Sequence, residues 1–224
     1  IYQSNLYFIT NDNKTYCLNT EDGGIKWIHY GINSTTKILG IASPVVYKEY
    51  VISSYSTGDL FILNKNSGKT VVSVKLTYKS IFSSNFDLTD IDSTPVIKDD
   101  VLIASANGGD IVAIDLSKMS IIWNKPISTL SNILINRDFI FILNTDNSLF
   151  ILNIKNGDTV WNKQIIDDIK YKKLFFANND IYVFNEMGYQ VIGLDGNVKN
   201  KIEKKLNLYG NPISINGVFY GIGK

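Results

Sequence analysis

Few residues of this chain belong to the types that carry out chemistry. Cys17 is the one cysteine and His29 the one histidine among 224 residues. A lone cysteine excludes an intrachain disulfide and a cysteine-based metal cluster, and a lone histidine has no second imidazole at metal-binding spacing. His29 has no nucleophile motif beside it, and no glycine-rich phosphate-binding motif occurs. We therefore expect Cys17 to be a buried, inert thiol, His29 to lie on the rim or surface, and the protein not to be an enzyme.

The charged clusters favour solvated loops over binding sites. Asp167 and Asp168 precede a basic stretch at 170–173, and no Asp-containing turn supplies the alternating oxygens and the glutamate of a calcium loop. Four lysines without interleaved aromatic residues form a second cluster: Lys199, Lys201, Lys204 and Lys205. Arg137 is the one arginine, so bidentate guanidinium readout of nucleic acid is almost absent. We expect no metal, no other cofactor and no nucleic-acid partner.

The residue bias indicates an all-β protein. Basic residues number 22 and acidic residues 21, and the formal charge of +1 argues against an acidic or basic tail. No apolar run reaches the length of a membrane-spanning helix. Strand-forming residues dominate, and no stretch has apolar residues at helical spacing over three turns. Strands and turns must therefore position whatever site the chain carries.

A repeat of about forty residues runs through the chain. Each copy has a short alternating strand that ends in Asn or Asp, a polar turn that usually contains glycine, and a second strand. The anchor residues that end the first of these strands are Asn19, Asn64, Asp115, Asn153 and Asp195. Eight residues after the anchor, the first four copies have Trp27, Val72, Trp123 and Trp161. The fifth copy has a shortened turn and no tryptophan.

Each full copy resolves into four strands. The second copy predicts strands at Ser43–Tyr47, Tyr50–Tyr55, Asp59–Asn64 and Lys69–Val74, with turns between them. Four-stranded antiparallel units at a regular period point to a β-propeller. A β-sandwich is the alternative, but it would not explain the recurring anchors. We expect one propeller domain over residues 1–224, with repeat units at roughly 1–31, 32–80, 81–128, 129–168 and 169–206 and a partial unit at 207–224.

The tryptophan and glycine positions resemble a known repeat. The stretches from Asn19 through Gly23 to Trp27 and from Asn153 through Gly157 to Trp161 are similar to the "ALD-x-x-x-G-x-x-x-W" unit of the PQQ-like (quinoprotein-type) propeller repeat. In that family the tryptophan of the outer strand docks against the neighbouring blade. The resemblance thus implies that the tryptophans are structural blade anchors: Trp27, Trp123 and Trp161.

A longer stretch resembles one propeller family in particular, the BamB family. Asp90-Ile-Asp92-Ser-Thr-Pro95-Val, and Lys37-Ile-Leu-Gly40-Ile-Ala-Ser43-Pro44 upstream, resemble two segments of that family in order and spacing. BamB proteins are lipoproteins of the machinery that assembles β-barrel proteins into bacterial outer membranes. The resemblance implies a non-catalytic scaffold at the periplasmic face of the outer membrane of a Gram-negative bacterium, held by a lipid anchor outside this sequence. It also implies an eight-bladed ring, of which about five blades are present, with both ends incomplete.

In that family the two segments dock onto the periplasmic domain of BamA, the barrel-forming insertase. Carried over residue by residue, Asp90 and Asp92 are acidic contacts, and Ile38, Leu39 and Gly40 form the companion loop. Leu39 stands where the family has arginine, so a charge-assisted contact is lost there. The residues alone also fit a second interpretation, in which Asp90 and Asp92 form Asx turns that close the loop on its own backbone.

Two other functional classes remain open on the sequence. The PQQ-like repeat is shared with quinone-dependent dehydrogenases, so the chain could be a fragment of such an enzyme. Those enzymes commonly use an adjacent cysteine pair, whereas Cys17 stands alone. The other class is a propeller that binds a different protein or a glycan.

Overall fold

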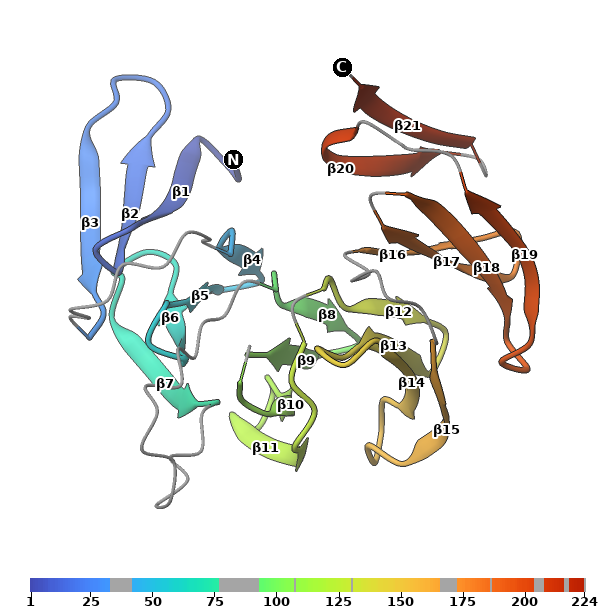
Figure 1. Ribbon diagram of the computed structural model, residues 1–224. Coiled ribbons are helices and arrows are strands. Elements are labelled where there is room, and N and C mark those ends of the chain that lie inside the picture. The colour runs from blue at the N-terminus through green and yellow to red at the C-terminus, as the bar shows by residue number, and fades with distance from the viewer. Residues whose placement is uncertain are drawn as a thin grey trace, which may run out of the picture. The chain divides into compact units, whose positions relative to one another are not determined.

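The computed structural model describes residues 1–32, 42–76, 93–106, 108–129, 131–165, 173–185, 187–203, 208–215 and 218–223. The chain divides into two compact units, Ile1–Thr129 and Leu130–Lys224. Each unit is a series of antiparallel sheets, which we number in chain order (Figure 1). All regular elements of the described residues are strands, as predicted.

The first unit contains three sheets. Sheet 1 has the order β1-β2-β3, sheet 2 β4-β5-β6-β7 and sheet 3 β11-β10-β9-β8. The bounds are β1 Asn5–Thr10, β2 Lys14–Asn19, β3 Ile25–Tyr30, β4 Val45–Tyr47, β5 Tyr50–Ser54, β6 Asp59–Asn64, β7 Thr70–Lys75, β8 Val96–Lys98, β9 Val101–Ser105, β10 Ile111–Asp115 and β11 Ser120–Lys125.

The second unit continues the pattern. Sheet 4 has the order β12-β13-β14-β15, sheet 5 β16-β17-β18-β19, and β20 pairs with β21. The bounds are β12 Leu134–Asn136, β13 Phe139–Leu143, β14 Ser148–Asn153, β15 Thr159–Gln164, β16 Lys173–Ala177, β17 Asp180–Asn185, β18 Gly188–Gly193, β19 Val198–Glu203, β20 Leu208–Ile215 and β21 Val218–Gly223. Four-stranded antiparallel units are therefore confirmed. No helix within the described ranges is long and apolar enough to cross a membrane.

The predicted strands of the second copy are right to within two residues. β4 begins at Val45 rather than Ser43, because Pro44 has no N–H to donate and restricts the residue before it. β5 ends at Ser54 because Tyr55 already belongs to the turn: its N–H donates to the Asp59 carbonyl and its carbonyl accepts from Gly58 N.

Tight two-residue turns join the first and second strands of sheets 2 to 5, and a similar turn at Gln3 and Ser4 precedes β1 of sheet 1. Their first residues have positive φ at 46–52° (Gln3, Lys48, Asp99, Arg137 and Asn178), as mirror-image hairpin turns require. Tyr2 pairs with Asn5 across the first of these turns as Tyr47 pairs with Tyr50 across another. The isolated Tyr2–Asn5 bridge therefore matches the end of the first hairpin of sheet 2, although sheet 1 itself has three strands.

A β-bulge recurs between the last two strands of each of sheets 1 to 5, and it corrects the predicted register of the fifth copy. The bulges place Trp27 opposite Cys17 and Trp161 opposite Ile151. In sheet 5 the corresponding pair is Val191 and Asn200. The predicted anchors Asn19 and Asp195 would align Gly193, not Val191, with Cys17, so the predicted register of the fifth copy is wrong by two residues.

The same error displaces the fifth anchor. Gly193 ends β18 opposite Asp180, as Asn153 ends β14 opposite Phe139, so Gly193 and not Asp195 is the anchor. Asp195 misleads because its Oδ1 accepts the N–H of Asn197, two residues on, just as the anchor Asn153 accepts from Lys155. Both make Asx turns, so one pattern occurs at two registers.

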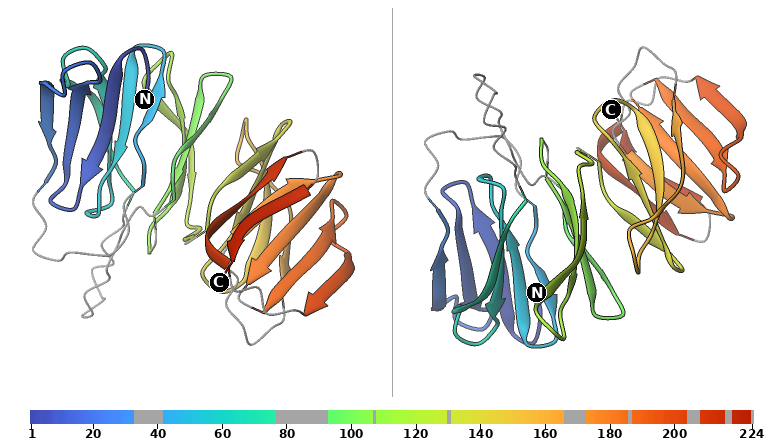
Figure 2. Two further views of the ribbon diagram at one scale, coloured as in Figure 1. Left: turned by 90° about the horizontal axis from the view of Figure 1, so that it is seen from above. Right: turned by 90° about the horizontal axis from the view of Figure 1, so that it is seen from below.

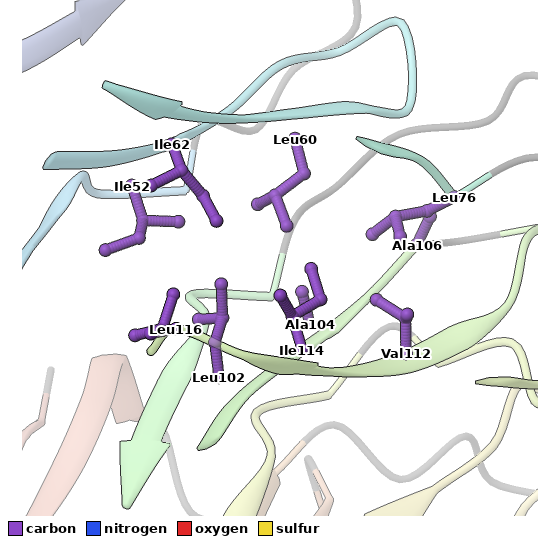
Figure 3. Close-up of a cluster of buried hydrophobic side chains, with 10 residues drawn as sticks. All are labelled: Ile52, Leu60, Ile62, Leu76, Leu102, Ala104, Ala106, Val112, Ile114 and Leu116. Atoms are coloured by element: carbon purple, nitrogen blue, oxygen red, sulfur yellow. The ribbon is translucent and has the colours of Figure 1, made fainter. Parts of the chain in front are cut away.

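Apolar side chains fill the spaces between consecutive sheets within each unit. Tyr7, Cys17 and Trp27 of sheet 1 pack on Val51 and Leu63 of sheet 2. Between sheets 2 and 3, side chains of β5 and β6 point toward those of β9 and β10 (Figure 3). A third cluster joins sheets 4 and 5. In both views of Figure 2 the sheets of each unit follow one another face to face. The central strands of sheets 2 and 3 are accordingly buried on both faces, whereas β2 of sheet 1 alternates between buried and half-buried residues.

Candidate partner-binding site

The antiparallel order places the predicted docking segments at one end of the sheets. In a four-stranded meander the chain enters the first strand and leaves the fourth at the end where the second and third strands are joined. We call this the connecting end. Ile38, Leu39 and Gly40 fall between β3 and β4, and Asp90 and Asp92 between β7 and β8. All five lie outside the described residues, so their predicted contacts stay predictions.

The chain is held firmly where it enters the first of these segments. Asn13 is 3% exposed, and its Nδ2 donates to the Ile32 carbonyl at 3.1 Å. Its Oδ1 accepts from the N–H and hydroxyl of Ser56 in sheet 2, at 3.1 and 3.0 Å. Gly31 N donates to the Asn13 carbonyl, and a Cβ at Gly31 would lie 2.7 Å from the Tyr55 ring. These contacts fix residues 31–32, directly before the segment that contains Leu39.

A polar seam between sheets 1 and 2 supports this entry point. Tyr55 OH lies 2.7 Å from Thr15 Oγ1 and 2.8 Å from His29 Nδ1. Thr15 also donates to Ser53 Oγ, and His29 Nε2 lies 3.0 Å from Thr70 Oγ1. Burial lowers the pKa of His29 and raises the pKa of Tyr55 to about 12. His29 is therefore half-buried in the seam, with its Nε2 contact on the exposed side.

The second segment also begins at a fixed point. Leu76 N donates to the Gly58 carbonyl, and the Leu76 carbonyl accepts from Asp110 N at 2.8 Å. A Cβ at Gly109 would lie 2.3 Å from the Leu76 oxygen, so glycine is required for this approach. The segment that contains Asp90 and Asp92 thus leaves sheet 2 from a backbone that sheet 3 holds.

At the opposite end of the sheets, two tryptophans contact the next sheet. Trp27 Nε1 donates to the Lys65 carbonyl at 2.9 Å, and Trp161 Nε1 to the Leu194 carbonyl at 2.8 Å. Both carbonyls follow an anchor residue directly, Asn64 and Gly193. Trp123 is 9% exposed. The role of the three tryptophans as stabilising anchors stays a prediction.

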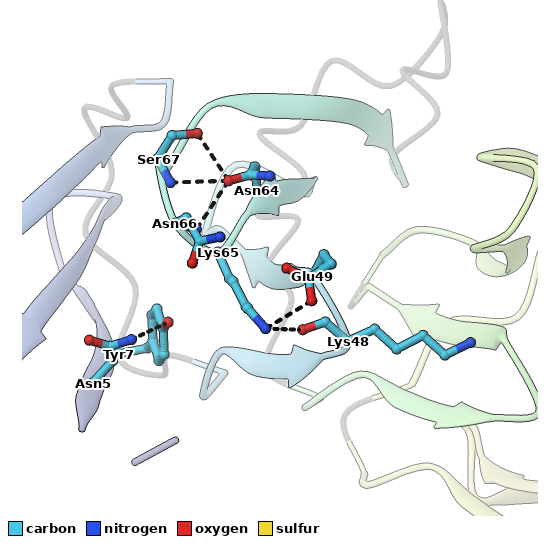
Figure 4. A network of polar contacts seen from close by, with 8 residues as sticks. All are labelled: Asn5, Tyr7, Lys48, Glu49, Asn64, Lys65, Asn66 and Ser67. Carbon is cyan, nitrogen blue, oxygen red and sulfur yellow. Dashed lines mark hydrogen bonds and ion pairs between the residues drawn. The ribbon is translucent and has the colours of Figure 1, made fainter. Parts of the chain in front are cut away.

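A network of polar contacts holds the turn that receives Trp27 (Figure 4). Lys65 Nζ donates to the Lys48 carbonyl at 2.9 Å and to Glu49 Oε1 at 3.1 Å. Asn64 Oδ1 accepts the N–H groups of Asn66 and Ser67, which closes the turn on its own anchor. Contacts within sheet 2 therefore position the Lys65 carbonyl that accepts the hydrogen bond from Trp27.

Cys17 has the environment of a packing residue. It is 1% exposed between sheets 1 and 2, and burial raises the pKa of its thiol. Such a thiol is protonated at neutral pH and inaccessible, so it is a poor nucleophile. Within the described ranges, no three His, Cys, Asp or Glu side chains gather as a metal site would require.

Sequence reasoning missed three residues of the connecting end: Asn13, Tyr55 and Asp110. Each occurs in a turn-rich stretch where polar residues are ordinary. The contacts that distinguish them are made to another sheet, and one sequence without its pairing does not reveal those contacts. Asp110 does follow a Gly-Gly pair, which is a signal of close backbone approach.

Comparison with known proteins decides the family. The family model described as outer membrane protein assembly factor BamB matches residues 1–163. The chain belongs to the BamB family. Relatives with that name include those of Francisella tularensis subsp. tularensis, 28% identical over 151 residues (66% of this chain, 32% of the relative), and Yersinia pestis, 24% identical over 184 residues (82% and 44%). The chain thus spans about a third to just under half of the length of these relatives.

Solved structures establish the propeller fold. The crystal structure of BamB from Moraxella catarrhalis superposes with a TM-score of 0.89 at 20% identity, over 100% of this chain and 68% of that chain. A europium-containing methanol dehydrogenase superposes with a TM-score of 0.74 at 13% identity, over 99% and 53%. At these identities the likeness shows the fold alone. The predicted β-propeller with PQQ-like repeats is confirmed.

Proposed function

We propose that this protein is a non-catalytic scaffold of the machinery that assembles β-barrel proteins into the bacterial outer membrane, and that it binds the periplasmic domain of a BamA-type insertase. The observation that carries the proposal is the family match over residues 1–163, which includes both predicted docking segments. The relatives' name, outer membrane protein assembly factor, supports a role at the outer membrane of a Gram-negative bacterium. We propose a location at its periplasmic face, with a lipid anchor outside this sequence.

The mechanism of such a scaffold is presentation of loops on a stiff framework. Packed sheets hold the chain at Ile32 and at Leu76, so the segments that follow start from positions that differ little between the free and the bound state. Less conformational entropy is then lost when a partner binds. Asp90 and Asp92 give the second docking segment negative charge, which favours a partner with basic residues.

The alternative of a quinone-dependent enzyme rests on fold likeness alone. The structural neighbours with that chemistry are 13–14% identical to this chain. Cys17 is single and buried, so it cannot supply the adjacent cysteine pair that such enzymes commonly use. Added PQQ and Ca²⁺ should produce neither a bound-quinone absorption band nor reduction of a redox dye with alcohols. Either signal would favour the enzyme.

Charge reversal tests the docking site. Asp90→Lys combined with Asp92→Lys should weaken binding to a BamA-type periplasmic domain at least tenfold in a calorimetric titration, because two favourable charges become repulsive. The control is Glu21→Lys with Asp99→Lys, which makes the same charge change on exposed residues at the opposite end of the sheets. Equal affinities of the two double variants would refute the site, and unchanged circular dichroism would confirm that both fold.

A further inference from the structure

Asp110 is a buried carboxylate to which no ion pair reaches from the described ranges. It precedes β10 at the connecting end of sheet 3 and is 7% exposed. Its one side-chain hydrogen bond within the described residues is from Asn124 Nδ2 to Oδ2 at 3.5 Å, the long limit for such a bond. Burial raises its pKa. Burying a carboxylate without compensation is unfavourable, so this arrangement needs a reason.

In the neighbouring sheet 2, the residue at the position of Asp110 is also a buried carboxylate, Asp59, but it has polar partners. Asp59 stands five residues before the anchor Asn64, as Asp110 stands five before Asp115, and it is 6% exposed. Thr57 Oγ1 donates to Asp59 at 2.5 Å, and Lys75 Nζ lies 4.0 Å away on the strand opposite. The compensated carboxylate in sheet 2 therefore has both a hydroxyl donor and a cation.

In sheet 3 the cation is replaced and space opens beside the carboxylate. Lys75 is three residues after Val72; the residue three after Trp123 is Pro126, which has no charge. A cavity of about 590 Å³ lies between the Gly108–Asp110 turn and the end of β11 from Asn124 to Ser128, with Pro126 in its wall. The replaced cation and the cavity thus occur at the same place.

The one lysine that lines this cavity among the described residues does not substitute for the replaced cation. Lys125 pairs with Ile111, the neighbour of Asp110, so its side chain leaves the sheet on the opposite face. Asn124 pairs with Val112, two residues from Asp110, and therefore shares its face. The carboxylate and an amide thus face the cavity together, and a cationic group that enters would meet an acceptor with unused capacity.

We propose that this cavity is a binding subsite for a lysine or arginine side chain of a protein partner, with Asp110 as its counter-ion. The inference rests on the proposed function for the identity of the partner, the periplasmic domain of a BamA-type insertase. It adds a third acidic contact at the connecting end, on the sheet whose Gly109–Asp110 backbone holds Leu76, where the Asp90 segment begins. A metal ion fits less well, because it needs several oxygen ligands and the described lining residues include a single carboxylate.

The Asp110→Asn variant distinguishes a binding role of Asp110 from a structural role. Asp110→Asn keeps the shape and removes the buried charge, so the variant should unfold at the same or a higher temperature than the unmodified chain. Its affinity for the insertase domain should fall about tenfold to a hundredfold, as loss of a charge-assisted hydrogen bond predicts. Asp115→Asn is the matched control at the other end of β10, where Ser117 and Lys118 hold the carboxylate. Its affinity should be unchanged.

A second measurement does not depend on the insertase. N-acetyl-arginine amide, a single cation with a free guanidinium group, should shift the backbone amide signals of Gly108, Gly109 and Asn124 in NMR spectra of the full chain. The shifts should be lost in Asp110→Asn and kept in Asp115→Asn. Absence of these shifts in the unmodified chain would overturn the inference, as would shifts that persist in Asp110→Asn.

The two measurements distinguish the subsite from the proposed function. If Asp110→Asn binds the insertase domain as tightly as the unmodified chain while the Asp90, Asp92 double variant does not, the subsite is wrong and the proposed function stands. If the unmodified chain does not bind the domain, the proposed function fails, and the arginine probe alone decides whether the cavity takes a basic side chain.

Discussion

Trp27 and Trp161, which donate to the next sheet, each contact a glycine in the turn that receives them. A Cβ at Gly68 would lie 2.5 Å from Trp27 Cε3, and Gly68 has φ +67°. Gly196 lies in the same relation to Trp161: a Cβ there would lie 3.6 Å from the indole, and its φ is +80°. Packing and backbone conformation therefore both require glycine at 68, whereas at 196 the requirement is mainly conformational.

Two substitutions test the tryptophan anchors. Trp27→Ala should lower the free energy of unfolding by about 3–5 kcal/mol, because a large, nearly buried side chain leaves a cavity. Gly68→Ala should lower it by about 1–3 kcal/mol, through overpacking and strain at positive φ. Both are measured by urea denaturation. A loss below about 1 kcal/mol for Trp27→Ala would show that the indole is not a blade anchor.

Between sheets 2 and 3, a valine and a methionine stand in place of the tryptophan and the glycine. Sheet 2 has Val72 at the tryptophan position, and the turn that follows in sheet 3 has Met119, at φ +53°, at the glycine position. Both side chains pack against the apolar cluster between the two sheets. We infer that the methionine side chain fills the space that an indole occupies elsewhere.

A double-mutant cycle measures this exchange. Val72→Trp alone should destabilise the protein because the indole collides with Met119, and Met119→Gly alone because it removes apolar contacts. The two together should be less destabilising than the sum, with a favourable coupling of about 1–3 kcal/mol. Additive effects in urea denaturation would contradict the inferred contact.

His29 makes part of the stability depend on pH. Because burial lowers its pKa in the folded state, the unfolded chain binds more protons below the ordinary value of 6.5. Stability should therefore be greatest above about pH 6.5 and fall as the pH drops from there toward the lowered pKa. His29→Gln should make the melting temperature less sensitive to pH between about 5.5 and 7.5. A variant with the unmodified protein's pH profile would contradict this explanation.

At the scale of elements, the mirror-image turns offer a stabilising change. Asn178 and Asn179 have φ of 51° and 63°, and both are exposed. Asn179→Gly creates the Asn-Gly pair that this turn prefers and should raise stability by roughly 0.5 kcal/mol. Asn179→Val should lower it, since a β-branched residue resists positive φ. Thermal unfolding that ranks these two variants in the reverse order would refute the turn assignment.

The elements were largely predictable, and the failures have local causes. The four-stranded copies could be located because the strands show alternating apolar residues and the turns between them contain Gly, Asn or Asp. The register of the fifth copy was not predictable, since Asp195 and a true anchor such as Asn153 make the same Asx turn. Only the pairing of Gly193 with Asp180 distinguishes the two.

At the scale of the whole molecule, the seams between sheets differ in chemistry. The seam between sheets 2 and 3 is filled by aliphatic side chains, whereas that between sheets 1 and 2 adds Thr15, His29 and Tyr55 at its connecting end. Such polar contacts between sheets cannot be identified in one sequence. The family was predictable from local motifs, and the docking segments stay a prediction. Asp110 was not predictable, because its significance lies in its pairing and burial within the fold.

Binding of a BamA-type insertase at the connecting end is the central claim. The most direct test is a calorimetric titration of the unmodified chain with a BamA-type periplasmic domain, at low and at high salt. We predict saturable binding that weakens as salt rises, because acidic residues supply part of the contact. Absence of binding at low salt, by a chain that circular dichroism shows to be folded, would contradict the claim.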